Sequence, residues 1–182
     1  MKDAHDRLRG ILFSLLGEDG TRLLIDSVKY AACSISLPYR ESMRRLASYR
    51  DIHKGERCFI IGNGPSINGM DLARLKGEYT FGLNRIYMNF DKMGFITTYL
   101  VAVNRYVISQ FGHDISEVKC PKFVDWVSRA YVPLKDDVVY LRTRRGPMFS
   151  SDVPRRGVWA ERRSPMLPCN WHTIWVFPGL YS

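Results

Sequence analysis

The sequence lacks the features that mark several common classes of protein. No apolar run reaches the length of a membrane-spanning helix, because the best candidate, Leu23 to Leu37, is interrupted by Asp26 and Lys29. None of the four cysteines pairs with another at CxxC spacing, so neither a zinc site nor a redox motif is indicated. No signal peptide is recognisable, which together with the scattered cysteines predicts a reduced, cytoplasmic setting.

The composition is that of a globular protein. The chain has 182 residues, of which 46% are hydrophobic and 25% charged, enough for one domain with a core or for a domain plus an extension. The net charge of +9 predicts a polyanionic neighbour, such as nucleotide phosphates, an acidic glycan, nucleic acid or an anionic membrane surface. Charge alone does not choose among these partners.

Residues 1–54 are expected to form a helical extension. Apolar residues recur at helical spacing from Leu8 to Leu16, Gly17 and Gly20 mark a break, and a second helix is predicted over Leu23 to Cys33. A third helix follows Pro38, with an apolar side (Met43, Leu46, Tyr49) and a basic side (Arg44, Arg45, Arg50). We interpret these helices as packed on the domain. The alternative is peripheral association of the basic helices with a membrane surface.

From residue 55 to 153 the pattern changes to short apolar strands that alternate with short helices. Near-continuous apolar strands separated by helices predict an α/β, Rossmann-like parallel sheet covered on both faces. The expected strands are CFIIG, YTFGLN, TTYLVAVN, PKFVD and VVYLR, and the expected helical segments are Met70 to Lys76, Ile86 to Met93 (closed by Gly94) and Tyr106 to Phe111.

The first strand runs directly into a glycine-rich turn, RCFIIGNGPS, over Arg57 to Ser66. Backbone N–H groups approach an anion closely only where side chains are absent, so Gly62, Asn63 and Gly64 suit a phosphate site. Pro65 suits the start of a short turn or helix, and the Ser66 hydroxyl can face an anion or cap the segment that contains Ile67 to Met70. The turn matches neither the GxGxxG fingerprint nor the P-loop pattern GxxxxGK[ST].

Asparagine recurs where the strands end, at Asn63, Asn84 and Asn104. Ligands of open parallel sheets bind beyond the carboxyl ends of the strands, and an asparagine offers both a donor and an acceptor. The three ends therefore predict one shared nucleotide site, to which we add Arg85. The alternative is that each asparagine starts a turn or caps a helix.

Three segments, FIIGNGPSINGMDLARL, FGLNRIY and YLVAVNRY, resemble the MptE-like domain family, a domain of unknown function, and the bacterial family-42 sialyltransferases. The resemblance covers roughly residues 54–152 and implies a Rossmann-like nucleotide-binding fold. In the sialyltransferases the donor is a CMP-activated sialic acid, and no metal or other cofactor is required. Carried over by position, the residues that contact the nucleotide are Asn63, Ser66, Asn84 and Asn104.

The MptE branch implies different chemistry on the same scaffold. It transfers diphosphate from ATP to a hydroxymethyl pterin and needs magnesium, for which Asp71, Asp91 and Asp152 are available without diagnostic spacing. Family members also continue past the segment matching Phe149 to Asp152 into a half that carries the sialyltransferase tyrosines and general-base histidine. None of the four histidines here has that context, so the resemblance leaves the catalytic residues unassigned.

Residues 154–182 are expected to be irregular, because no helical or strand period survives in this proline-, tryptophan- and arginine-rich segment. One interpretation is a basic-aromatic patch for nucleic acid or glycan. We favour a shifted reading frame, since codons for Ala160 to Phe177 read two bases on can spell GTAVTYVAMQLAYHLGF, which resembles the next helix of the sialyltransferases. This hypothesis predicts a chain that lacks its later strands and is weakly active or inactive. A genuine tail is the alternative, and the nucleotide sequence distinguishes the two.

Together the glycine turn and the asparagines predict a nucleotide site, and the resemblance implies a nucleotide-dependent transferase, a CMP-sugar glycosyltransferase of surface glycan synthesis. Its expected partners are a nucleotide or nucleotide sugar and a glycan or small-molecule acceptor, without nucleic acid. The alternatives are the pterin diphosphokinase, and a non-catalytic module that binds a nucleotide or a partner. The CMP-sugar transferase is expected to bind CMP without metal, and the diphosphokinase to bind ATP only with magnesium. Binding of neither would favour a module that binds another partner.

Overall fold

The computed structural model describes residues 2–145 and 158–160. The chain divides into two compact units, Met1–Arg40 and Glu41–Ser182. The first unit consists mainly of α1 (Lys2–Ser34), which is broken at Gly17, where the backbone turns to φ 68°. The sequence predicted a break here, and glycine permits it because it lacks the Cβ that strains this conformation. No helix in the described part of the chain is long and apolar enough to cross a membrane.

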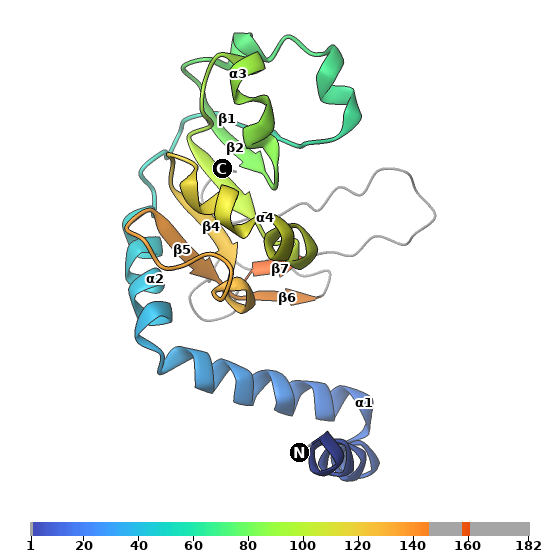
Figure 1. Cartoon of the computed structure of the whole chain (residues 1–182). Coiled ribbons are helices and arrows are strands. Elements are labelled where there is room, and N and C mark those ends of the chain that lie inside the picture. The colour runs from blue at the N-terminus through green and yellow to red at the C-terminus, as the bar shows by residue number, and fades with distance from the viewer. Residues whose placement is uncertain (1, 146–157, 161–182) are drawn as a thin grey trace. The chain divides into compact units, whose positions relative to one another are not determined.

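The second unit is built on a five-stranded parallel sheet (Figure 1). Its strands are β1 (Cys58–Ile61), β2 (Tyr79–Leu83), β3 (Tyr99–Ala102), β4 (Lys122–Asp125) and β5 (Val138–Leu141), and they lie side by side in chain order. All five were expected from the sequence, and the predicted α/β, Rossmann-like fold class is confirmed. Because the order is sequential, the described strands contain no point at which the winding reverses.

The connections between strands are short. They are η1 (Pro65–Gly69) and η2 (Leu72–Leu75), η3 (Ile86–Asn89) and α3 (Phe90–Met93), α4 (Arg105–Glu117), and η4 (Trp126–Ser128). Gly94 closes α3 at φ 74°, as predicted. The helix expected over residues 70–76 is instead the short 3₁₀ segment η2, and the helical turn expected over 106–111 is a full helix that extends to Glu117.

Alternating side chains give the sheet two apolar faces. Leu100, Val124 and Val138 face one cluster, which every connection joins, for example through Ile86 and Ile108. Tyr99, Val101, Phe123, Val139 and Leu141 face the other cluster, where Leu46 of α2 (Leu37–Ser48) packs with Met43 and Tyr49. The connections therefore cover one face and α2 the other, as the predicted burial on both faces requires.

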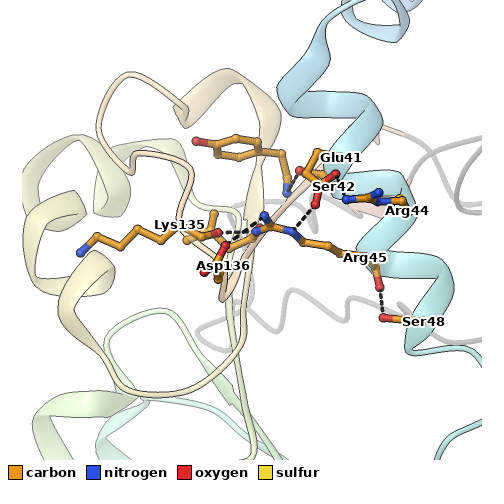
Figure 2. A network of polar contacts seen from close by, with 9 residues as sticks. Glu41, Ser42, Arg44, Arg45, Ser48, Lys135 and Asp136 are labelled. Atoms are coloured by element: carbon orange, nitrogen blue, oxygen red, sulfur yellow. Dashed lines mark hydrogen bonds and ion pairs between the residues drawn. The ribbon is translucent and has the colours of Figure 1, made fainter.

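Helix α2 also seals one edge of the sheet (Figure 2). Tyr140 of β5 donates its backbone N–H to Ser42 Oγ over 3.0 Å, and Arg45 donates to the carbonyl oxygens of Lys135 and Val138. Arg45 was expected on the basic outer side of the helix with Arg44 and Arg50, and this prediction is wrong. Its guanidinium instead satisfies carbonyls at the edge of the sheet, which blocks pairing with further strands.

The other edge is β1, where the Ile60 side chain is 48% exposed. A separate pair of parallel strands, β6 (Thr143–Arg145) and β7 (Val158–Ala160), follows the main sheet. The strand β7 differs from the irregular structure expected over 154–182. The remainder of that segment, the proposed reading-frame shift, Phe149 and Asp152 lie outside the described residues.

Candidate functional site

The predicted site residues follow the carboxyl ends of neighbouring parallel strands, so they lie at one end of the sheet, which we call the carboxyl edge. Ile61 pairs with Gly82 at the end of β1, and Asn63 and Asn84 each follow this pair by two residues along the chain. Leu83 pairs with Val101, and the backbone N–H of Asn84 donates to the Val101 carbonyl over 2.8 Å. Asn104 follows β3 at the same edge. The three strand ends are therefore neighbours, as the parallel arrangement predicted.

The turn after β1 is open to an approaching ligand. Asn63, Gly64, Pro65 and Ser66 are exposed, and Ile67 anchors the turn in the core. Gly64 has an ordinary extended backbone (φ −73°, ψ 161°), so no unusual angle requires glycine there. A Cβ at this position would have the Ser66 Oγ, 3.9 Å away, as its nearest neighbour. The absent side chain therefore leaves the backbone uncovered on its solvent side.

Pro65 starts the short helix after this turn, and Ser66 does not cap it. Pro65 begins η1, which confirms the predicted helix start, and Ile67 N donates to Gly64 O over 3.1 Å. Gly64 occupies the cap position, and no side chain caps η1. Ser66 therefore is not the cap, and its exposed hydroxyl lies beside the Gly64 backbone.

Asn84 has the most unusual geometry of the predicted residues. Its backbone is left-handed (φ 52°), a conformation that asparagine adopts more readily than other residues with a side chain. Its Oδ1 atom is buried and has no hydrogen-bond partner among the described residues. A buried acceptor without a donor costs free energy, so a ligand N–H or O–H at this point would remove a penalty.

Asn104 is the cap of α4. Its Oδ1 accepts the backbone N–H of Tyr106 over 3.0 Å, so the capping alternative accounts for this oxygen. The helix begins at the same edge of the sheet, where its free N–H groups favour negative charge. The cap is thus compatible with an anion nearby, and a direct contact of Asn104 with a nucleotide stays a prediction.

Arg85 follows Asn84 and reaches toward α4. Its guanidinium carbon lies 3.6 Å from the centroid of the Phe111 ring. Burial raises the pKa of the nearby Tyr87 hydroxyl, and a hydrogen bond with Arg85 opposes that shift. The Tyr87 hydroxyl also lies 3.5 Å from Asp114 Oδ2. Arg85 and Tyr87 therefore join the end of β2 to the middle of α4.

Asp125 is a residue of this edge that sequence reasoning missed. It ends β4, it is only 4% exposed, and its Oδ1 accepts the Val127 N–H over 3.4 Å. Burial raises the pKa of its carboxyl, against the opposing influence of Val127, Thr143 and Arg105. The available signal was an acid closing the apolar run KFVD. In the sequence, that run predicts only a strand.

The other candidates lie elsewhere. Asp71 precedes η2 and Asp91 lies in α3, both exposed, and no group of three or more metal-binding side chains occurs within residues 2–145 and 158–160. His53 Nε2 lies 2.6 Å from the Tyr99 hydroxyl, at the amino end of β3 and thus away from the candidate site. His113 is exposed within α4.

No protein-family model, no curated protein and no solved structure matches the chain.

Proposed function

We propose that the parallel-sheet unit is the nucleotide-binding domain of a transferase that uses a CMP-activated sugar. The observation that carries the proposal is Asn84, whose buried Oδ1 has no donor among the described residues and which follows β2, the strand beside β1 and its exposed glycine turn. A nucleotide would satisfy both features. Its base and ribose carry N–H or O–H donors for the Asn84 oxygen, and its phosphate accepts hydrogen bonds from backbone N–H groups of the turn. The resemblance to CMP-sugar transferases narrows the nucleotide to CMP.

In this proposal the turn and the asparagines have separate tasks. Residues 62–66 hold the phosphate through backbone N–H groups, with the Ser66 hydroxyl beside them. Asn84 and Asn104 orient the nucleoside. Catalysis then rests on positioning the donor and stabilising the departing nucleotide, because a preorganised set of donors favours the charge that develops on its phosphate.

One observation favours the alternative, diphosphate transfer from ATP. Asp125 places a carboxylate at the same edge as the glycine turn. Magnesium commonly binds through one or two carboxylates together with the phosphates of the substrate. In this alternative the metal would arrive with ATP, and Asp125 would contribute a ligand from β4.

Thermal unfolding with a panel of nucleotides tests the two proposals. A ligand that binds only the folded state raises the midpoint, by about 2.7 kcal/mol of stabilisation at a concentration of 100 Kd. The CMP-sugar proposal predicts a shift with CMP and CDP in the presence of EDTA. Diphosphate transfer predicts a shift with ATP that requires magnesium. An unchanged midpoint with every nucleotide would contradict both and favour a module that binds another partner.

A further inference from the structure

Arg85 differs from the arginines that form ion pairs with glutamates. Arg57 pairs with Glu78, and Arg45 pairs with Glu41. No carboxylate within the described residues lies within ion-pair distance of Arg85, and its buried Nε has no hydrogen-bond partner there. Its charge is therefore held near the strand ends without a neutralising acid in contact.

The stacking on Phe111 holds this charge in a defined place. The guanidinium carbon lies over the ring, 3.6 Å from its centroid. An arginine stacked on an aromatic face keeps its N–H fork available in the plane of the group while losing little further freedom on binding. A planar fork of this kind matches the oxygens of a phosphate.

We propose that Arg85 binds the phosphate of the nucleotide, with Phe111 as the platform that fixes its orientation. This inference rests on the proposed function and adds the cation of the site. Asn84, the adjacent residue, would contact the nucleoside of the same ligand. The buried Nε and the unpaired charge of Arg85 both gain a partner when an anion arrives, whereas a neutral nucleoside gives neither.

Cytidine and CMP differ only in the phosphate, so their two affinities separate phosphate recognition from general damage. We expect Arg85→Gln to weaken CMP about ten- to a hundredfold, the range for one hydrogen-bonded charge, and to leave cytidine within about twofold. Phe111→Leu keeps the charge but removes the platform, so it should give a smaller loss for CMP alone. Arg129→Gln is the matched control, because Arg129 also stacks on an aromatic ring, 4.5 Å from Trp126, and should change neither affinity.

Calorimetric titration of the full chain measures all eight affinities. An equal loss of CMP and cytidine in Arg85→Gln, or no loss, would overturn this inference while leaving the nucleotide site standing. Failure of the unchanged protein to bind CMP would overturn the inference and the proposed function together. If Arg85→Gln does not fold, Arg85→Lys and Phe111→Leu test the inference instead, through the ratio of their CMP and cytidine affinities.

Discussion

Lys122 and Asp137 form an ion pair at the amino end of the sheet, opposite the candidate site. Lys122 begins β4 and is fully buried, whereas the Asp137 side chain is 38% exposed. The two residues also share a backbone hydrogen bond, from Lys122 N to Asp137 O over 2.7 Å. Water can therefore reach Asp137 when its partner is removed, but it cannot reach Lys122.

This difference predicts an asymmetric response to mutation. Asp137→Ala leaves an ammonium in the core with no counter-charge, which costs about 3–5 kcal/mol for a buried pair. Lys122→Met leaves a carboxylate that water can reach, so the cost should be nearer the ~1–2 kcal/mol of a lost hydrogen bond. The double variant removes both charges and should be more stable than Asp137→Ala alone, since the unpaired ammonium is gone.

Urea unfolding of the four proteins at one pH and salt concentration gives the free energies and the coupling between the two sites. The surface pair Lys135–Glu117, 2.7 Å apart, is the control, and Lys135→Ala should cost less than about 1 kcal/mol. Two results would refute the reasoning. One is a Lys122→Met variant less stable than Asp137→Ala, and the other is additivity of the two changes within about 0.5 kcal/mol.

Three further predictions concern Gly112, Ser42 and Asp125. Gly112→Ala should lower the unfolding free energy by about 1–3 kcal/mol through overpacking, because its Cβ would lie 2.6 Å from the Tyr131 carbonyl oxygen. Gly10→Ala, with open space around the new Cβ, should instead stabilise α1 by about 0.5–1 kcal/mol. Urea unfolding that gives a change of the same sign for both variants would contradict this prediction. Ser42→Ala should lower the unfolding free energy by about 1–3 kcal/mol, because it leaves the Tyr140 N–H without this acceptor. At the exposed Ser48, the same change to alanine should lower it by under about 0.5 kcal/mol. Equal losses in the two variants would show that Ser42 does not seal the edge of the sheet. Asp125 has a raised pKa in the folded state, so the folded protein binds more protons than the unfolded one and stability falls as pH rises above the ordinary value of 3.8. Asp125→Asn should therefore gain stability relative to the unchanged protein between acid and neutral pH, and unfolding curves with a pH-independent difference would count against burial as the cause.

The five strands could be predicted because each is an apolar run that ends at a polar or glycine residue. The faces of the third helix were harder to predict. Helical spacing separated Met43 and Leu46 from Arg44 and Arg45, but it could not show that a sheet edge lies beside the apolar stripe. Arg45 contacts that edge, because its long side chain extends beyond the core to the carbonyls of Lys135 and Val138.

The candidate site shows the same division. Parallel strands place Asn63, Asn84 and Asn104 at one edge, which follows from the sequence pattern alone. The left-handed backbone of Asn84 and the stacking of Arg85 on Phe111 depend on contacts with segments distant in the chain, so no local pattern signals them. Asp125 also escaped notice, because an acid that ends a strand is indistinguishable in sequence from an ordinary turn residue.

The most direct test of the nucleotide site is the titration of CMP into the unchanged protein and into Asn84→Gly, in EDTA. Glycine adopts the left-handed backbone at φ 52° without strain and removes the whole side chain, the carboxamide included, so the variant should fold at least as stably. We expect CMP to bind the unchanged protein and to bind Asn84→Gly roughly tenfold more weakly, as for one lost hydrogen bond in a buried site. Equal affinity of the two proteins, or no heat of binding in either, would contradict the account.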